Sequence, residues 1–304
     1  MIAFSTCWNS SRHNDGEEMI DEILELGFDT IEISHGLSIA LLPGIKKAYD
    51  EGKFKVSGLH NFCPSPVEVM IDAPDCYEFT SHRSYDRKRA LDLTLRTIEY
   101  AAEFKATYVV LHMGNVPMTK MTPELTALVK QGKLNTPEFV EMKLKTVKLR
   151  EKTAPLYLNR AKEALAEIAK HAEKFRVKAA VESRSRYEDV PSEREMIELM
   201  KEYADNPWVG YWHDFGHVQL KHNLSLLDHE EWLETMEPYL IGCHLHDVHW
   251  PARDHRVPMT GTINYDPLVP LVGDDKYVVW ELSPRRRKSQ IEKQFPLWKE
   301  TYGI

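Results

Sequence analysis

Short runs of apolar, β-branched or aromatic residues recur along the chain, and a longer segment with helical periodicity follows each of them. Several runs are almost continuously apolar, which is typical of parallel strands that are covered on both faces. The segments 16–28 and 156–175 are predicted to be helices. The predicted strands are residues 2–7, 29–34, 56–62, 108–114, 178–184, 209–215, 240–248 and 276–284.

This alternation predicts an α/β fold, a single closed (β/α)8 barrel of the TIM type. Composition does not change abruptly anywhere, so residues 1–304 are expected to form one domain. A doubly wound open sheet is the alternative fold, but the chain has no glycine-rich nucleotide loop that would favour it.

Two connections are long. Residues 63–84 follow the third predicted strand, and residues 115–155 follow the fourth, with several prolines in the second segment. Both leave from the carboxyl ends of strands, where barrel enzymes build their active sites. We interpret them as long loops, either lids over a pocket or ordinary surface loops.

Charge and composition restrict the class of partner. The formal net charge is −8 and the sequence pI is about 6.0, whereas nucleic-acid binding depends on clustered Lys and Arg. The four cysteines show no CxxC spacing, which argues against a disulfide framework or a thiolate zinc site. The sequence shows no signal-peptide pattern and no bilayer-length apolar run. We therefore expect a cytoplasmic protein that binds neither nucleic acid nor membrane.

Residues able to bind a metal ion stand at the carboxyl ends of most predicted strands. In a closed barrel these ends converge on one opening, although they are far apart in sequence. A single histidine at such a place is more often a hydrogen-bonded core residue than a ligand, so the repeated pattern carries the argument. The residues are His60, His112, Glu182, Asp214, His217, His244, His246, Asp247 and Glu281.

The glutamates are the most informative members of this set. Glu182 ends the apolar run AAVE and Glu281 ends YVVWE, so each carboxylate is expected to be buried, where it is costly without a partner. Carboxylate and imidazole ligands without thiolates suit Mn²⁺, Mg²⁺, Co²⁺ or Zn²⁺. The sequence therefore predicts a site for one divalent metal ion, whose identity this ligand set leaves open.

These motifs resemble the xylose isomerase-like TIM-barrel superfamily (AP endonuclease family 2 type), which includes sugar and sugar-phosphate isomerases and epimerases and endonuclease IV. The resemblance extends over essentially the whole chain. It is carried by WHDFGH (212–217), HLHD (244–247), DHRVPMTGTINY (254–265) and WELSP (280–284).

The resemblance implies a metal site and a substrate site. By analogy with epimerases of the D-tagatose 3-epimerase type, the metal ligands are Glu182, Asp214, His244 and Glu281. His246 is the alternative ligand on the same strand; His244 is preferred because it precedes Asp247 by three residues. Substrate contacts are expected from His60, His112, His217, His246, Arg253 and His255.

The implied activity is isomerisation or epimerisation of a small sugar or sugar phosphate. A divalent metal stabilises an enediolate, while Glu182 and Glu281 act as the catalytic acid/base pair on opposite faces of one carbon. Barrels of this kind often pair, so a homo-oligomer is left open.

Two segments of the chain are rich in basic residues, and the first of them differs from the family pattern. The family often has Asn or Pro and then His after the strand-five glutamate, but here the order is Glu182-Ser183-Arg184-Ser185-Arg186. Arg184 or Arg186 could bind a phosphate or carboxylate, or be exposed. The run 285–288, RRRK, opens the last predicted helix, where cations oppose the helix dipole and indicate a nearby anion or a solvated face.

Three other functions are compatible with these residues. A three-zinc phosphodiesterase of the endonuclease IV kind would use a similar set, although Asp254 and His255 are adjacent rather than spaced as Asp-x-His. A lyase acting on 3-keto sugars or glycosides would need the same metal and base. A barrel that binds such a ligand without turnover would not need two glutamate bases.

Overall fold

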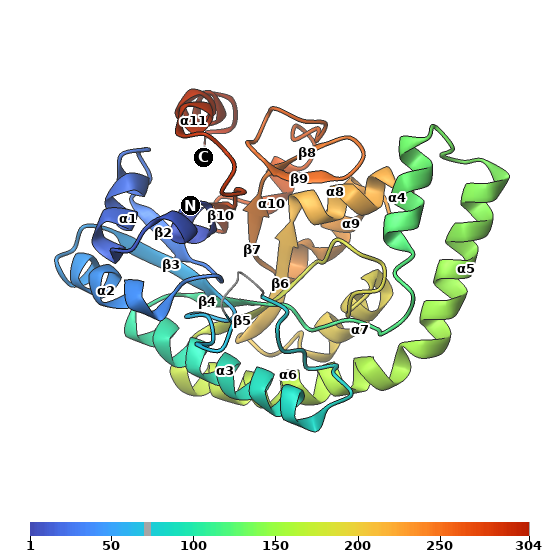
Figure 1. Ribbon diagram of the computed structural model, residues 1–304, viewed down its shortest axis with the longest axis horizontal. Helices are drawn as coiled ribbons and strands as arrows, with labels where there is room; N and C mark the ends of the chain where they lie inside the picture. The colour runs from blue at the N-terminus through green and yellow to red at the C-terminus, as the bar shows by residue number, and fades with distance from the viewer. Residues whose placement is uncertain (70–73, 304) are drawn as a thin grey trace.

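Eight parallel strands close into a barrel, in the order β1-β10-β7-β6-β5-β4-β3-β2 (Figure 1). The computed structural model describes residues 1–69 and 74–303. The predicted barrel is therefore confirmed, and every predicted strand run overlaps one of its strands. The strands are β1 Ile2–Ser5, β2 Thr30–Ile33, β3 Lys55–His60, β4 Tyr108–Leu111, β5 Lys178–Glu182, β6 Val209–Asp214, β7 Leu240–Leu245 and β10 Tyr277–Trp280.

Helices cover the outside of this barrel (Figure 1). The longer ones are α1 Gly16–Leu24, α2 Leu42–Asp50, α3 Ser84–Glu103, α4 Thr122–Lys130, α5 Pro137–Thr153, α6 Pro155–Phe175, α7 Glu193–Glu202, α8 Phe215–Asn223, α9 His229–Met236, α10 Val269–Val272 and α11 Lys288–Tyr302. The short 3-10 turns are η1 Thr6–Trp8, η2 Ser10–Arg12, η3 Ile39–Leu41 and η4 Glu237–Tyr239. A separate antiparallel pair, β8 Asp247–His249 and β9 Arg253–Arg256, extends from the end of β7.

Alternate residues of each strand point into the barrel, which divides its packing into two regions. The large apolar core lies between the strands and the helices. Inside the barrel, residues from β1, β4, β5, β6 and β10 form a small apolar cluster, which we call the barrel floor. Its members are Ala3, Tyr108, Val110, Ala180, Trp212 and Val279.

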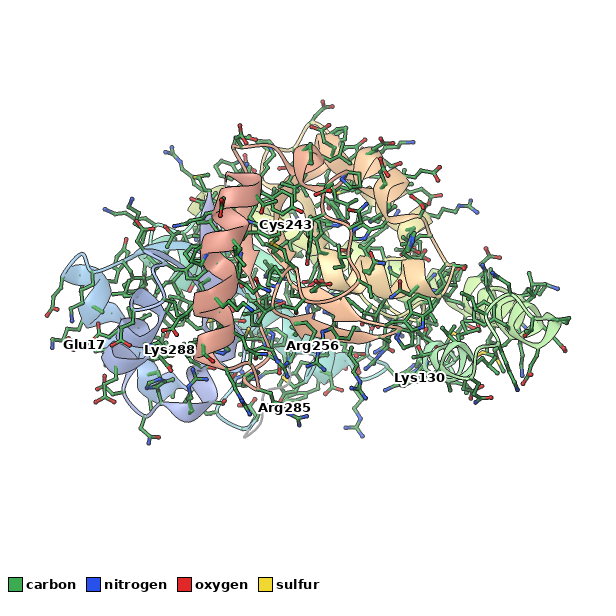
Figure 2. The ribbon with its side chains drawn as sticks, turned by 90° about the horizontal axis from the view of Figure 1, so that it is seen from above. Glu17, Lys130, Cys243, Arg256, Arg285 and Lys288 are labelled. Carbon is green, nitrogen blue, oxygen red and sulfur yellow. The ribbon has the colours of Figure 1, made fainter. Side chains whose placement is uncertain are left out.

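The second long connection is helical, which differs from the loop expected over 115–155. It contains α4 and α5 and runs directly into α6, and α4 and α5 extend to one side of the molecule (Figures 1 and 2). Pro123, Pro137 and Pro155 occupy the first turns of these helices, where a residue without an N–H costs no hydrogen bond. The expectation of a loop over 115–155 was therefore wrong, because these prolines begin helices.

The other long connection, 63–84, holds no strand among its described residues, and its helical content is the start of α3. Residues 70–73 of this expected loop lie outside the described part of the chain. Within the described residues, none of the helices combines the length and apolar character that spanning a bilayer would need. The assignment of 1–304 to one domain stays a prediction.

A buried ion pair connects α5 to α7 and to the segment between β5 and α7. Arg150 donates to both carboxylate oxygens of Glu195 on α7, at 2.8 and 2.7 Å, and to the carbonyl oxygen of Asp189 at 2.8 Å. Only 2% of Arg150 is exposed. Burial alone would raise the pKa of Glu195, but its bonds to Arg150 outweigh this and lower it.

We expect Arg150→Ala to lower the free energy of unfolding by about 3 kcal/mol, because Glu195 is left buried without its cation. Chemical denaturation measures the loss. Arg194→Ala is the control, since Arg194 pairs with Glu198 on the exposed surface of α7 and should change stability little. Equal effects of the two substitutions would show that the buried pair does not hold α5 in place.

Candidate metal centre

Four side chains from four different strands meet at the carboxyl end of the barrel. Glu182, Asp214, His244 and Glu281 are buried, and one ligand atom from each lies within 4.8 Å of all the others. The Nδ1 atom of His244 lies 2.9 Å from Glu182 Oε1, 3.4 Å from Glu281 Oε2 and 3.8 Å from Asp214 Oδ2. We call these four residues the carboxylate cluster. Three carboxylates and one imidazole nitrogen are a donor set that fits a divalent metal ion.

Strand alternation explains why these side chains converge. Glu182 lies two residues after Ala180, and Asp214 two residues after Trp212, so each points to the same side of its strand as a residue of the barrel floor. In the register between β6 and β7, Asp214 stands opposite His244. The floor therefore closes the barrel beneath the carboxylate cluster, and the cluster faces the open end.

The buried carboxylates of the cluster and the histidines beside them shift one another's pKa. Burial alone would lower the pKa of His244, but Glu281 and Glu32 outweigh it and hold the pKa well above its usual range. Burial would raise the pKa of Glu182, yet His112 and His244 keep it well below its usual range. Both shifts show that the carboxylates need a positive charge among them, which a protonated histidine or a cation can supply.

Glu32 on β2 orients the ring of His244. The Nε2 atom of His244 lies 3.2 Å from both carboxylate oxygens of Glu32, so Glu32 holds a proton on Nε2. The Nδ1 atom faces the cluster and can bind a cation once it has lost its own proton. Tyr108 donates its hydroxyl to Glu32 at 3.2 Å and contacts Ser57 at 3.1 Å. The sequence analysis missed Glu32, although an acid inside the apolar run TIEI is the same signal that singled out Glu182.

A charged group surrounds the outer oxygen of Glu182. His112 Nε2 lies 2.7 Å and Arg184 Nη1 lies 3.0 Å from Glu182 Oε2, and Asp75 contacts both partners at 2.7 and 3.1 Å. Burial and Arg184 would lower the pKa of His112, but Asp75 and Glu182 raise it to about 9. Arg184 is thus already paired with carboxylates, whereas Arg186 is exposed.

His60 and His35 continue the row of histidines that begins with His112, whose ring lies 4.7 Å from that of His60. The ring of His60 stacks on that of His244 at 5.6 Å between centroids, and the ring of His35 lies 4.6 Å from His60. His35 Nε2 also lies 4.0 Å from a Glu281 oxygen. Burial, with His35 and His112 nearby, holds the pKa of His60 well below its usual range. His35 did not stand out in the sequence because it follows β2 as one polar residue in a turn.

His246 differs from His244 in how its nitrogens are used. Its Nδ1 atom accepts the backbone N–H of His255 at 2.9 Å, and its Nε2 atom lies 3.0 Å from Asp214. The ring therefore donates to Asp214 through Nε2–H and keeps no free lone pair for a cation. His217 also supports Asp214, donating its backbone N–H to Oδ1 at 2.6 Å, and its ring Nδ1 lies 3.1 Å from the carbonyl oxygen of Ser183.

Asp247, the last residue of HLHD, holds a loop rather than joining the carboxylate cluster. It is fully buried, and its carboxylate accepts backbone N–H groups from Val248, Thr260, Gly261 and Ile263 at 2.7 to 3.2 Å. A Cβ atom on Gly261 would lie 2.4 Å from an Asp247 oxygen. The MTGTI part of the motif is therefore shaped to wrap around this carboxylate.

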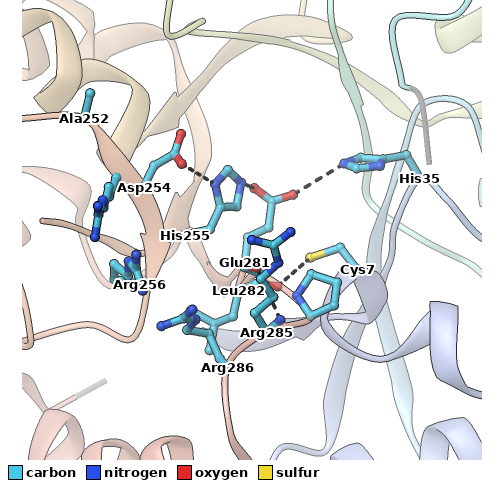
Figure 3. A pocket seen from close by; sticks show the side chains of 13 residues that line it. Cys7, His35, Ala252, Asp254, His255, Arg256, Glu281, Leu282, Arg285 and Arg286 are labelled. Carbon is cyan, nitrogen blue, oxygen red and sulfur yellow. Dashed lines mark hydrogen bonds and ion pairs between the residues drawn. The ribbon is translucent and has the colours of Figure 1, made fainter. Parts of the chain in front are cut away.

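A cavity of about 700 Å³ opens beside the carboxylate cluster (Figure 3). Glu281 belongs to both, and His255 joins them, with Nε2 3.4 Å from Glu281 and Nδ1 3.3 Å from Asp254. Asp254 and His255 thus contact each other, but Asp254 belongs to none of the groups of potential metal ligands found among the described residues. Arg253, expected to contact substrate, lines the cavity from β9 and is exposed.

Family comparison agrees with the fold. The sequence profile of the xylose isomerase-like TIM barrel matches residues 20–301. The chain belongs to this family. No curated protein matches it in sequence.

Several solved structures have a similar fold. A D-tagatose 3-epimerase-like protein is 18% identical with a TM-score of 0.68, covering 99% of this chain and 98% of that chain. The 3-keto-D-glucoside 4-epimerase from E. coli is 17% identical with a TM-score of 0.67 and the same coverage. The IOLI protein with a binding zinc atom is 14% identical with a TM-score of 0.66, covering 100% and 99%. At these identities the likeness shows the shared fold.

His213, the second residue of the motif WHDFGH, belongs to a buried chain of hydrogen bonds on the side of β6 that faces away from the carboxylate cluster. His213 points away from Asp214, and its two ring nitrogens contact Tyr211 Oη at 2.9 Å and His229 Nε2 at 3.0 Å. His229 Nδ1 lies 2.9 Å from Gln219 Oε1, and this amide oxygen can only accept, so His229 Nδ1 donates to it. His229 Nε2 then accepts from His213 Nε2, and His213 Nδ1 accepts from the Tyr211 hydroxyl, so both rings are neutral. Burial, with His213 beside it, holds the pKa of His229 well below its usual range.

Stability of the metal-free protein should fall as the pH drops below about 6.5, because the unfolded chain binds a proton at His229 that the folded chain does not. In His229→Gln the slope of unfolding free energy against pH should decrease, by up to about 1.4 kcal/mol per pH unit. Tyr211→Phe removes a hydrogen bond but keeps the titrating ring, so it should lower stability and retain the slope. Denaturation between pH 5 and 7 in chelator tests this; equal slopes in wild type and His229→Gln would contradict it.

Proposed function

We propose that the protein is a divalent-metal-dependent isomerase or epimerase that acts on a sugar or sugar phosphate by proton transfer through an enediolate. The observation that carries the proposal is the convergence of Glu182 and Glu281 with Asp214 and His244 at one buried point. Membership in the xylose isomerase-like family supports it. So do the names of similar structures, which describe epimerases of tagatose, psicose and a keto-glucoside.

Glu182, Asp214, His244 and Glu281 would hold the metal. His244 would be the strand-seven ligand because Glu32 holds the proton on Nε2 and leaves Nδ1, once deprotonated, to face the metal. Mn²⁺, Mg²⁺, Co²⁺ and Zn²⁺ all fit oxygen and imidazole donors; one similar structure is described with zinc. When bound, a divalent ion supplies positive charge beside the substrate carbonyl, which acidifies the neighbouring C–H bond.

The two glutamates are placed to move the proton. β5 and β10 are separated by β6 and β7 around the barrel, so Glu182 and Glu281 approach a bound carbon from different sides. Histidines hold the pKa of both carboxyls well below the usual range, so both are ionised but weakly basic, and proton removal would depend on the acidity that a bound metal gives the substrate C–H bond. Proton return to the opposite face of the carbon epimerises it, and return to the adjacent carbon isomerises the sugar.

Neighbouring side chains would orient the substrate. His217, His255 and His112 border the carboxylate cluster, and with His60, His246 and Arg253 they surround the space above it. A small-molecule partner, rather than nucleic acid or membrane, fits the net charge of −8. The cytoplasmic location and a homo-oligomer stay predictions.

A multi-metal phosphodiesterase is the second candidate, and one observation favours it. Three further groups of potential ligands overlap the carboxylate cluster in the described chain: His35, His60 and Glu281; His60, Glu182 and His244; and His246, His255 and Glu281. The lone pair of His246 is occupied by a backbone N–H, which weakens the last group. Metal stoichiometry separates the candidates, because the isomerase requires one ion per chain and the three-zinc enzyme requires three.

We expect the metal-loaded protein to hold one divalent ion per chain and to exchange solvent deuterium into a ketose, ketose phosphate or keto sugar. Glu182→Gln and Glu281→Gln should each lose at least about 100-fold in exchange rate, because each removes one acid/base group. Mass spectrometry measures exchange, and circular dichroism checks the fold.

Glu78→Gln is the matched control, since Glu78 contacts Asn115 and Thr80 outside the carboxylate cluster and should keep full exchange. Full activity and metal content in Glu281→Gln would contradict the role of strand β10. Release of an aglycone from a keto-glycoside would identify a lyase instead.

Glu32→Gln should weaken metal binding by about 10- to 100-fold, because the amide cannot offer two anionic oxygens to His244 Nε2–H. Competition with a chromogenic chelator measures this affinity without any need for turnover. Ser57→Ala, at the far end of the same hydrogen-bond chain, should change affinity much less. Unchanged affinity in Glu32→Gln would show that His244 is oriented by other contacts or is not a ligand.

A further inference from the structure

Four arginines line the cavity beside the carboxylate cluster. Arg253 and Arg256 come from β9, and Arg285 and Arg286 come from the segment between β10 and α11. Figure 3 shows Arg256, Arg285 and Arg286 around the same opening as Glu281 and His255. Figure 2 shows Arg256 and Arg285 on the same side of the molecule as Lys288, where α11 begins. We call Arg253, Arg256, Arg285 and Arg286 the arginine quartet.

The arginine quartet lacks counter-ions within the described residues. None of its members has a carboxylate within 4.0 Å in residues 1–69 and 74–303, whereas Arg12, Arg89, Arg150, Arg184 and Arg194 each pair with one. The Nε atoms of Arg256 and Arg286 are buried and have no hydrogen-bond partner in the described chain. Buried donors without an acceptor are costly, so their presence indicates that an acceptor joins them.

The two carboxylates that line the same cavity, Asp254 and Glu281, do not fill this role. Asp254 contacts His255 at 3.3 Å, and His255 in turn contacts Glu281. Burial, together with Arg256 and Arg285, lowers the pKa of Arg286, which is the effect of like charges gathered without an anion. Helix α11 begins at Lys288, two residues after Arg286, and its first turn adds positive potential from the helix dipole.

We propose that the arginine quartet binds an anionic group of the substrate, a phosphate monoester or a carboxylate, while the reacting carbon lies at the carboxylate cluster. This inference rests on the proposed isomerase or epimerase function and narrows its substrate class to acidic or phosphorylated sugars. Guanidinium groups match both anions through paired, planar hydrogen bonds. A cavity of about 700 Å³ lies within the usual range for small-molecule sites.

Continuity between the two regions connects binding with chemistry. Glu281 belongs to the carboxylate cluster and also lines the cavity, so one molecule can contact both. An anion at the arginine quartet fixes one end of an acyclic sugar and places its carbonyl end toward Glu281. A neutral sugar brings no anion to the buried Nε atoms of Arg256 and Arg286, which disfavours its binding.

The first test measures binding of inorganic phosphate to metal-free protein by calorimetry, with wild type, Arg256→Gln and Arg286→Gln. Each substitution should weaken phosphate binding at least about tenfold, because it removes charged donors to the anion. Arg287→Gln is the matched control: Arg287 is the next residue along the chain, exposed and outside the cavity lining. It should bind phosphate as wild type does.

The second test compares deuterium exchange into neutral ketoses, ketose phosphates and keto sugar acids. An anionic substrate should have a kcat/KM at least about tenfold above its neutral counterpart, and Arg286→Gln should abolish that preference. Preference for phosphate or for carboxylate identifies which anion binds; either supports the inference. The inference is overturned if neutral and anionic sugars are used equally and if Arg256→Gln and Arg286→Gln both bind phosphate as wild type does. That result leaves the proposed function standing. Arginine-dependent phosphate binding without exchange into any sugar refutes the proposed function and leaves the anion site standing.

Discussion

Burial of several carboxylates around a single imidazole is the constraint on which the rest of this structure depends. Glu182, Asp214 and Glu281 meet His244 at the open end of the barrel, and Glu32 approaches the same ring from the other side. Like charges so close together in a protein interior are unstable unless a cation or a proton joins them. The pKa shifts of His244 and Glu182 in opposite directions are the direct consequence.

The barrel makes this concentration of charge possible. Its floor is apolar, with Trp212 and Tyr108 among its fully buried members, so apolar packing holds the strands together below the carboxylate cluster. Behind β6, the chain from Tyr211 through His213 to His229 is satisfied by neutral partners. The stable packing and the charged chemistry therefore occupy different layers of one scaffold, as in other barrels.

The sequence predicted the features that arise from short-range patterns. Apolar runs located the strands, and acids at the ends of AAVE and YVVWE identified Glu182 and Glu281, because burial and alternation are visible in a single strand. The helices within 115–155 escaped prediction because prolines serve both as loop residues and as the first residues of helices. The pairing of Arg184 with Asp75 and the contact of Glu32 with His244 depend on which strands are neighbours or face each other, which no local pattern contains. The catalytic and metal-binding assignments stay predictions that this geometry supports.

The most direct measurement is a crystal structure of the protein soaked in Mn²⁺, with anomalous diffraction recorded near the manganese edge. The account predicts one anomalous peak, bonded to His244 Nδ1 and to carboxylate oxygens of Glu182, Asp214 and Glu281 at about 2.0 to 2.3 Å, in keeping with metal–ligand distances in proteins. A map with no peak among these four side chains, or with a peak bound by His246 in place of His244, would contradict it.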